Sequence, residues 1–457
     1  MKLKEAKILI DIMMALSLSL IFIVIISDSA AESRDIFLHA QERNNLLNSF
    51  EASSTTIITS TRPYGNDWIQ TDSTVKDSSG ISISFTAVRA LASSITSKGD
   101  GTPICSADFG QSSVTGSYQA ANVSNASTSL NITAINLPIN QLLPLTDIEV
   151  REGTAYISSD SSNASDPDLF VIDVSNPATP KLISSINTGP GISAITLHGK
   201  RIYAAAASTA AQLHVIRFDV LNAPILEKKY KLPLPYATAT PPLASSIFYK
   251  NDRIYLGTEK WDGDEFSIID VSNPASPTKV GGLETGSKVN DILVKNNTAY
   301  IAASDEKQLR LIDVKDSANP TVINSFSPSG WARQEGKSLS SFEDDLNFGR
   351  TSGGYDITTD HELFAWATTS TTTLLSPQSV NEKGGIYGIV QDRSHLFTIT
   401  HEVNRELITF MPNSFGNPFA TSSAYSLPVI PQMLTCDGDK LYILAHYSPT
   451  LYEITFK

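Results

Sequence analysis

Cysteine is almost absent from this sequence, since Cys105 and Cys436 are its only two in 457 residues. This scarcity excludes CxxC redox pairs, cysteine-rich zinc sites and a small scaffold held together by many disulfides. A single disulfide between the two remains open on composition alone.

Positive charge is also in short supply. The chain has 34 Lys and Arg against 47 Asp and Glu, a formal net charge of -13 and a sequence pI near 5.0. No stripe of basic residues interleaved with aromatics occurs, so the composition excludes nucleic acid as a partner. The sequence also lacks GxSxG, HExxH and Walker motifs, so no standard catalytic motif and no cofactor are indicated.

The sequence has one long apolar run, at residues 8–26, with a single charge in it. Such a run crosses about 30 Å of hydrocarbon as a helix. Lys2, Lys4 and Lys7 precede it, and the positive-inside rule then places the rest of the chain outside the cytoplasm. A plain signal anchor fits as well, and a cleaved secretory signal is the further alternative, because residues 29–31 suit a signal peptidase.

The start of the chain resembles the amino terminus of type IV pilins and pseudopilins. MKLKEA would be the leader, Ala6 the residue before cleavage, Lys7 the first mature residue and Asp11 the acid at the fifth mature position. The resemblance implies processing after Ala6, and an Asp11 that pairs with the amino terminus of a neighbouring pilin-like subunit. Gly, an apolar residue and Glu are usual in the family where Ala6, Lys7 and Asp11 stand here.

The composition divides the chain into three parts. Residues 1–50 would be the leader, membrane helix and helical stalk. Residues 51–127 are rich in Ser, Thr, Gly and Asn and predict a small β-rich domain or stalk with a linker, with β-like runs at 55–60 and 80–88. Residues 128–457 carry a repeat.

The repeat is most visible in three nearly identical segments, VIDVSNPATP at 171–180, IIDVSNPASP at 268–277 and LIDVKDSANP at 311–320. Aligning them reveals a mostly aromatic column at Tyr156, Tyr203, Tyr255, Tyr300, Asn347, Phe397 and Tyr442. Eight residues before each member stands an Ile or Leu: Ile148, Ile195, Ile247, Ile292, Leu339, Ile389 and Leu434. Repeats of 45 to 52 residues with several short strands are typical of propeller blades, so the fold class predicted is a mainly β, seven-bladed propeller.

The phrasing of these segments resembles LVIVD-repeat proteins, a family of extracellular or surface β-propellers without a common activity. In the blade, VID would end the third strand, and Asp173, Asp219, Asp270 and Asp313 would accept hydrogen bonds in the following turn. The last copy lacks a fourth strand. We predict that residues 129–138 supply it and close the ring in the manner of velcro.

Cys436 falls in a column otherwise occupied by buried aliphatic residues such as Val150, Leu197 and Val294. We therefore predict that it is a small buried hydrophobic residue without a disulfide to Cys105.

Ligands of propellers usually bind where the loops before the inner strands meet those between the second and third strands. In this chain that face would gather Trp261, Trp331, Arg333, Tyr355, His401 and His446, a set suited to carbohydrate or peptide recognition, although loop packing explains it equally well. Acidic loops at 160–168 and 261–265 offer oxygen ligands for calcium, without the spacing of a known calcium motif.

These observations predict a non-enzymatic binding or assembly protein, anchored in the membrane through its amino-terminal helix and displayed at the cell surface. Pilus or pseudopilus association and adhesion fit the pilin-like start, and the ligand would be a protein or a carbohydrate. The alternative is an extracytoplasmic propeller enzyme of the lactonase or glycan-cleaving type, for which the inner strands offer chiefly Asp147 and Asp291 as acid or base groups.

Overall fold

The computed structural model describes residues 56–63, 68–76, 82–90, 104–105 and 130–456. Within the last range 140–142, 162–164, 220–222, 329–333, 343–344, 353–360, 368–376, 393–394, 412–417 and 420 are not described. The predicted leader, membrane helix and stalk of residues 1–50, with Ala6, Lys7 and Asp11, lie outside these residues. Within the described ranges no helix is long and apolar enough to cross a membrane. The chain divides into two compact units, residues 1–97 and 98–457.

The first unit contains a three-stranded antiparallel sheet in the order β1-β2-β3. Its strands are β1 (Thr56–Pro63), β2 (Trp68–Lys76) and β3 (Ser82–Ala90). The two strands expected near 55–60 and 80–88 are present, and β2 between them was not predicted. Its register places Ile57 opposite Val75 and Val75 opposite Ile83, which aligns apolar residues across the three strands.

The second unit contains seven sheets, six of which have four consecutive strands in sequence order. The first two blades are β6 (Leu145–Arg151), β7 (Thr154–Ser159), β8 (Leu169–Asp173), β9 (Lys181–Ile186), then β10 (Ile192–His198), β11 (Arg201–Ala206), β12 (Leu213–Phe218) and β13 (Pro224–Tyr230). The third and fourth are β14 (Ala244–Lys250), β15 (Arg253–Thr258), β16 (Phe266–Asp270), β17 (Thr278–Leu283), then β18 (Val289–Lys295), β19 (Thr298–Ala303), β20 (Leu309–Asp313) and β21 (Thr321–Phe326).

The fifth and sixth blades are β22 (Gly336–Phe342), β23 (Asp345–Arg350), β24 (Leu363–Ala367), β25 (Gln378–Val380), then β26 (Gly388–Gln391), β27 (Leu396–Ile399), β28 (Leu407–Met411) and β29 (Thr421–Tyr425). The seventh combines β30 (Pro431–Gly438), β31 (Lys440–Ala445) and β32 (Thr450–Phe456) with two strands from earlier in the chain. The first strand of each blade contacts the first strand of the next, and β30 contacts β6, so the ring is closed. The prediction of a mainly β, seven-bladed propeller is confirmed.

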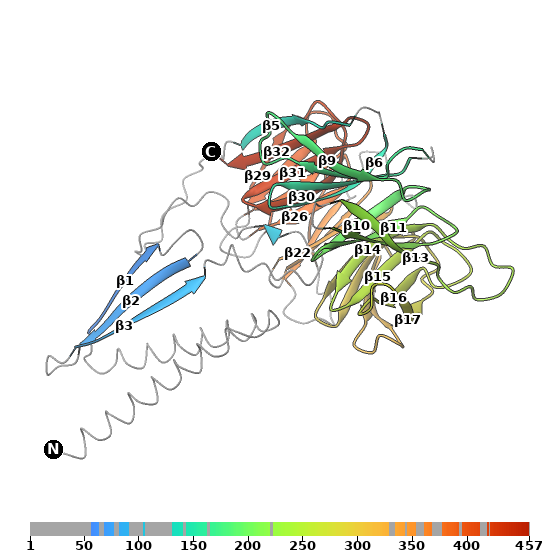
Figure 1. Ribbon diagram of the computed structural model, residues 1–457, viewed down its shortest axis with the longest axis horizontal. Coiled ribbons are helices and arrows are strands. Elements are labelled where there is room, and N and C mark those ends of the chain that lie inside the picture. Colours follow the sequence, from blue (N-terminus) through green and yellow to red (C-terminus); the bar gives the residue numbers. More distant parts are fainter. Residues whose placement is uncertain are drawn as a thin grey trace, which may run out of the picture. The chain divides into compact units, whose positions relative to one another are not determined.

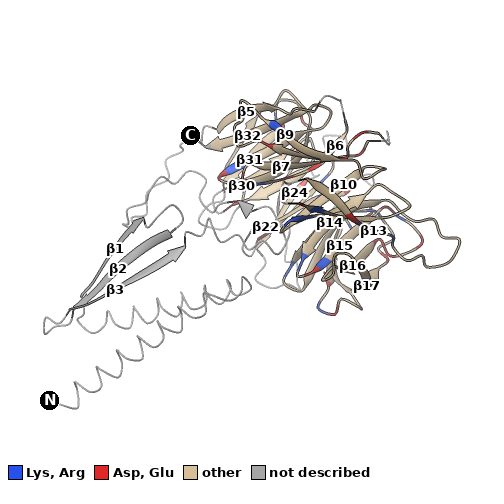
Figure 2. Cartoon of the chain, in the orientation of Figure 1, with Lys and Arg blue, Asp and Glu red and all other residues tan. Residues whose placement is uncertain are grey.

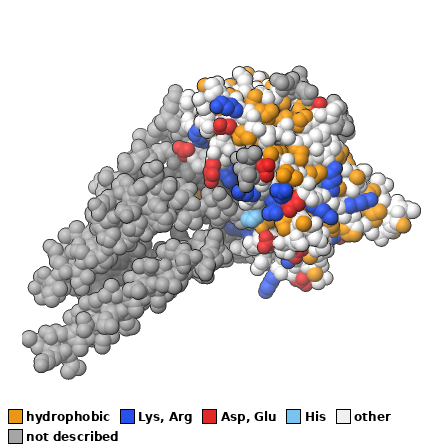
Figure 3. Space-filling model, viewed as in Figure 1, with side chains coloured by type: hydrophobic (Ala, Val, Ile, Leu, Met, Phe, Trp, Pro, Cys, Tyr) orange, Lys and Arg blue, Asp and Glu red, His pale blue; other side chains and the backbone are white. Residues whose placement is uncertain are grey.

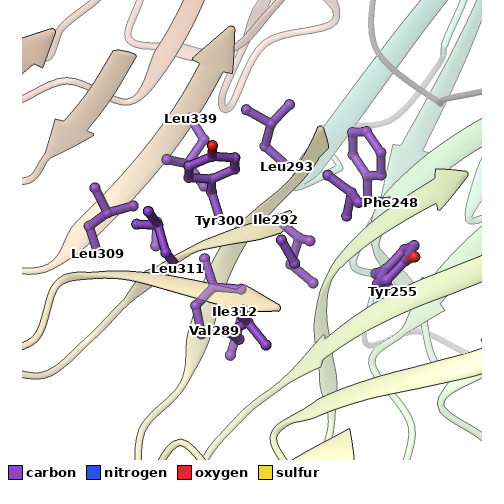
Figure 4. Packing of buried hydrophobic residues seen from close by; sticks show 14 of the residues in the cluster. Phe248, Tyr255, Val289, Ile292, Leu293, Tyr300, Leu309, Leu311, Ile312 and Leu339 are labelled. Atoms are coloured by element: carbon purple, nitrogen blue, oxygen red, sulfur yellow. The ribbon is translucent and has the colours of Figure 1, made fainter. Parts of the chain in front are cut away.

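Both sequence columns have the positions expected of them. The seven Ile and Leu residues lie on the inner strands and are 2 to 9% exposed. The mostly aromatic column lies on the second strands, where Tyr300 and Tyr442 are each 1% exposed. One core cluster fills the space between the third, fourth and fifth blades: Ile292, Leu293 and Tyr300 of the fourth blade pack with Phe248 and Tyr255 on one side and Leu339 on the other (Figure 4). Apolar packing between adjacent blades therefore stabilises the ring.

The seam is closed as predicted. β5 (Leu130–Asn136) pairs antiparallel with β32, with Ile132 opposite Ile454 and Ile135 opposite Leu451. Figure 1 shows this early strand, in teal, beside the red β32. β5 satisfies the backbone groups of an edge that would otherwise be open, and Ile135 is fully buried.

The prediction about the cysteines is wrong. Cys436 is 2% exposed, as its column indicated, but it is disulfide-bonded, and Cys105 is the only other cysteine of the chain. The short strand β4 (Ile104–Cys105) pairs in parallel with Asp437 and Gly438 at the end of β30. A backbone pairing between positions more than three hundred residues apart left no local signal in the sequence.

Candidate functional site

One hydrogen bond is repeated in all seven blades and builds one face of the ring. The first residue after the second strand, or in the sixth blade the second residue, donates its backbone N–H to a carbonyl of the loop that leads into the inner strand, over 2.9 to 3.3 Å. The pairs, donor first, are Asp160–Pro144, Ala207–Gly191, Glu259–Leu243, Ser304–Lys288, Thr351–Glu335, His401–Gly384 and His446–Ile430. The loops between second and third strands therefore lie beside the loops that lead into the inner strands. We call the side of the ring where these loops lie the entry face.

Buried polar side chains form hydrogen bonds to the backbone of the same loops. In six blades the residue directly before the third strand is buried and polar: Asp168, Gln212, Glu265, Gln308, Glu362 and Glu406. Glu265, for example, accepts the backbone N–H groups of Thr285 at 2.7 Å and Gly286 at 3.1 Å. Asp168 accepts those of Thr188 and Gly189 in the same way. We call these six side chains the buried caps. They fix the loops, because a buried polar group that loses its hydrogen bond costs free energy. Our sequence reasoning missed them, although a polar residue before each apolar run was a visible signal.

A channel of about 240 Å³ runs along the axis and is lined by the inner strands of all seven blades. The ring of aliphatic side chains from the Ile and Leu column forms part of its wall. Thr146, Ser193, Ser245 and Asn290 add polar groups near the start of their strands. Four charged residues line it: Asp147, Glu149, Asp291 and Lys337.

The three acids of the channel bind backbone groups of the next blade. Asp147 accepts the N–H of Ile148 and that of Ile195, both at 2.8 Å. Asp291 stands in the equivalent position and accepts from Ile292 at 2.8 Å and Leu339 at 2.7 Å. An inner strand has no further strand on its channel side, so these carboxylates satisfy donors that the sheet leaves unpaired.

Burial dominates the titration of these acids. It raises the pKa of Asp147 and of Asp291 to about 7, although backbone N–H bonds oppose the change. It raises the pKa of Glu149, which accepts the N–H of Leu197 at 3.0 Å, to about 8. The channel therefore holds three carboxyl groups that change charge near neutral pH.

Lys337, the second residue of β22, is the basic residue of the channel. It is half-buried, and in the part of the chain that the structure describes it makes no hydrogen bond and no ion pair. Burial lowers its pKa and nearby Lys288 adds to this effect, while Asp291 and Glu335 oppose it. The channel thus contains a cation without a direct partner.

His401 and His446, both predicted site residues, are brought together on the entry face by the sixth and seventh blades. Burial lowers the pKa of each, and the charge of Lys337 lowers both further. His401 stacks on Tyr387 with 3.5 Å between ring centroids, and its Nε2 lies 3.1 Å from the carbonyl oxygen of Pro431. The Nδ1 atom of His446 is buried and has no hydrogen-bond partner. The two imidazoles thus lie near Lys337, close to the start of the inner strands.

Sequence comparison agrees with the repeat geometry. A family profile described as LVIVD repeat matches residues 146–188, 261–285 and 286–327, which are the whole first and fourth blades and the outer half of the third. The chain carries LVIVD repeats. None of the curated proteins matches the sequence.

Two solved structures have a backbone fold similar to that of this chain. One is a protein from Lactobacillus plantarum, with 9% identity and a TM-score of 0.49 over 81% of this chain and 96% of that one. The other, from Bacteroides fragilis and provisionally named a 6-phosphogluconolactonase, has 12% identity and a TM-score of 0.47 over 86% of this chain and 98% of that one.

Four other site residues of the LVIVD-repeat propeller were predicted from the sequence. Trp331, Arg333 and Tyr355 lie outside the described residues. Trp261 is half-buried, packs over Gly263 between β15 and β16, and does not line the channel. These positions stay predictions.

The acidic loops proposed for calcium have other partners where they are described. Asp264 forms an ion pair with Lys279 at 2.7 Å, and Asp262 accepts a hydrogen bond from the hydroxyl of Tyr236. In the first blade Asp166 accepts a hydrogen bond from Ser161 at 3.0 Å. Among the residues with assigned positions no group of three metal-binding side chains occurs. Calcium binding remains a prediction.

The aspartates of the LVIVD corners have the structural role expected of them. Asp173 accepts the N–H and the hydroxyl of Ser175 at 3.0 and 2.6 Å, and Asp270 binds Ser272 in the same way. Asp219 and Asp313 accept the N–H groups of Ala223 and Lys315, both at 2.9 Å. The repeated motif therefore specifies a turn.

Charges of both signs are spread over the blades rather than gathered on one (Figure 2). On the face shown in Figure 3, basic, acidic and apolar side chains of the propeller alternate over short distances. A surface mixed in this way gives little long-range attraction to a charged macromolecule. The channel is thus the better candidate for specific recognition.

Proposed function

We propose that this LVIVD-repeat propeller is a non-enzymatic binding protein whose recognition site is the entry-face end of the channel. Its ligand is one residue of a carbohydrate or peptide chain, or a small molecule of that size. The observation that carries the proposal is the convergence of Lys337, His401 and His446, from three successive blades, beside a channel lined by all seven.

The size and the rigidity of the site support this function. A volume of about 240 Å³ is just below the range of roughly 300 to 1,000 Å³ typical of ligand sites, so only a small group fits. The repeated loop bonds and the buried caps hold the entry face in one arrangement. A preformed site loses little conformational entropy on binding.

The test is a screen of the full-length protein against an array of mono- and oligosaccharides and short peptides. Ser193→Trp places a large ring in the channel, and we expect it to abolish the binding found with the wild type. Leu182→Trp is the matched control, because Leu182 is 44% exposed on the outer strand of the preceding blade. Equal binding by wild type and Ser193→Trp, with unchanged melting temperatures, would place the recognition site elsewhere.

We further propose that residues 1–50 anchor the protein in the membrane, with the propeller at the cell surface, as a component associated with a pilus or pseudopilus. The basic leader, the apolar run and Asp11 support this. The disulfide of Cys436 suits an oxidising environment outside the cytoplasm. Amino-terminal sequencing of native protein tests the anchor: cleavage after Ala6 supports the pilin-like form, no cleavage a plain signal anchor, and cleavage after Ala31 a secreted protein.

A second candidate function, hydrolysis of the lactonase or glycan-cleaving type, is favoured by the raised pKa values of Asp147, Glu149 and Asp291. A carboxyl group that is neutral near pH 7 is suited to general acid catalysis. Against it, all three carboxylates already bind backbone N–H groups. Hydrolysis in place of simple binding would be established if the wild type turned over a lactone or glycan and the Asp291→Asn protein did not.

A further inference from the structure

We propose that the channel binds a small anion, a carboxylate- or phosphate-bearing molecule, through Lys337 and the Nδ1 atom of His446. This inference rests on the proposed function and names the chemical class of its ligand. It follows from two groups that lack a hydrogen-bond partner, the ammonium of Lys337 in the channel and the Nδ1 atom of His446 on the adjoining entry face.

The carboxylates of the channel already accept hydrogen bonds. Asp147, Glu149 and Asp291 each bind a backbone N–H of the following blade, as described above. Glu335, beside the channel, accepts from Asn290 at 3.3 Å and from Ser304 at 3.2 Å. A cationic ligand would have to compete with these bonds. The site is therefore poorly suited to a cation.

Two donor groups, in contrast, have no partner. Lys337 makes no hydrogen bond or ion pair within the described chain, although a half-buried ammonium normally has a partner. The hydroxyls of Thr146, Ser245 and Ser246 already donate to backbone carbonyls. The Nδ1 atom of His446 is buried without a partner, and an anion would select the tautomer in which it carries a proton. Lys337 is thus the charged side chain of the channel without a direct partner, and the Nδ1 atom of His446 is unpaired on the adjoining entry face.

The walls limit the rest of the ligand. The ring of Ile and Leu side chains offers no hydrogen bonds, and the volume of about 240 Å³ admits only a compact body. A short hydroxy acid, a sugar acid or a sugar phosphate combines a small body with an anionic end. Such a ligand would place its charge at Lys337 and its less polar part toward the aliphatic ring.

The experiment is calorimetric titration of the full-length protein with acetate, inorganic phosphate, glucuronate and uncharged glucose. We expect saturable binding of at least one anion and much weaker binding of glucose. Lys337→Met removes the charge at similar length and should weaken anion binding at least about tenfold. Lys279→Met is the matched control, because Lys279 lies on the outer strand of the third blade, away from the channel, and pairs with Asp264 at 2.7 Å, and its anion binding should match the wild type.

A second measurement separates a direct role of Lys337 from a structural one. Nuclear magnetic resonance of the Lys337 side chain should show its pKa rising on anion binding, because an adjacent negative charge stabilises the ammonium form. No binding of any of the three anions, or equal binding by wild type and Lys337→Met, would overturn the inference. If uncharged ligands bind in the channel and Ser193→Trp abolishes that binding, the proposed function stands while the anion is excluded.

Discussion

Aspartate has two opposite environments in this protein. At the corner of the first blade, Ser175 donates two hydrogen bonds to Asp173, which is partly exposed to water, and these bonds lower the pKa of Asp173. Asp147, on the inner strand of the same blade, also accepts two hydrogen bonds, both from backbone N–H groups, yet burial raises its pKa to about 7. The number of hydrogen bonds is the same, so the difference comes from desolvation.

The raised pKa of Asp147 predicts how stability depends on pH. The carboxyl of Asp147 loses its proton near pH 3.8 in the unfolded chain but only near pH 7 in the folded protein. The free energy of unfolding therefore falls as pH rises through that window. One such group contributes a slope of up to about 1.4 kcal/mol per pH unit. We expect Asp147→Asn to flatten the curve between pH 4 and 7 in urea denaturation series.

Asp173→Asn is the control for that experiment. Its pKa is lowered, so its contribution to stability is present above the unfolded value and is lost only at more acidic pH. The slope between pH 4 and 7 should be unchanged in this variant. An Asp147→Asn protein with the wild-type slope would show that Asp147 is ionised throughout.

A charge in the aliphatic column should unfold the propeller. Ile292 is 3% exposed between the third and fifth blades, so Ile292→Asp buries a carboxylate among apolar side chains at a cost of several kcal/mol. Val322→Asp is the control in the same blade, since Val322 is 49% exposed on β21 and its change should stay within about 0.5 kcal/mol. A soluble Ile292→Asp protein with the circular dichroism of the wild type would contradict this packing.

At the scale of the element, the seventh blade differs from the others because the chain ends on its third strand. The fourth strand comes from β5, more than three hundred residues earlier. Its apolar residues Ile132 and Ile135 complete the packing against β32. Closure of the ring therefore depends on a strand that precedes the seven repeats in the chain.

Removal of β5 should destabilise the ring. We expect a chain beginning at Thr146 to aggregate or to melt well below one beginning at Ser127, because β32 would then expose unpaired backbone groups and apolar side chains. Both chains lack Cys105, so the disulfide does not enter the comparison. Equal melting temperatures in differential scanning calorimetry would mean that the ring closes in another way.

At the scale of the whole molecule, two strands from before the repeats are joined to the seventh blade. β5 adds to its outer edge and β4 to its inner edge, and the disulfide of Cys436 adds a covalent link. A crosslink across so long a loop restricts the unfolded chain most strongly. The seam of the propeller is thus reinforced on both sides.

Loss of this link should lower the melting temperature. Reduction, or the substitution Cys105→Ser, is expected to destabilise the protein by about 2 to 4 kcal/mol. Thermal melts of the wild type with and without reductant measure the effect, and the Cys105→Ser protein should not respond to reductant. An identical melting temperature for reduced and oxidised wild type would show that the bridge adds no stability.

The sequence by itself determined the blades, their number and the strand that closes them. Each depends on local patterns: an Ile or Leu eight residues before an aromatic position, a polar turn between them, and an aspartate that ends the third strand. Such patterns repeat because every blade packs between two similar blades and must bury the same two faces of its sheet. The residues of the corners could be assigned for the same reason.

Only the tertiary structure decided which side chains meet on the axis. The sequence pattern placed His401 and His446 in loops of the entry face, but Lys337 was not singled out, because its environment depends on being half-buried beside residues of other blades. The functions of Asp147 and Asp291 as ties between blades, and the partner of Cys436, also depend on contacts between distant segments. The sequence shows which positions of each blade are buried, because these positions repeat. Contacts between side chains of different blades form only when the ring closes, since desolvation and hydrogen bonding act between neighbours in space.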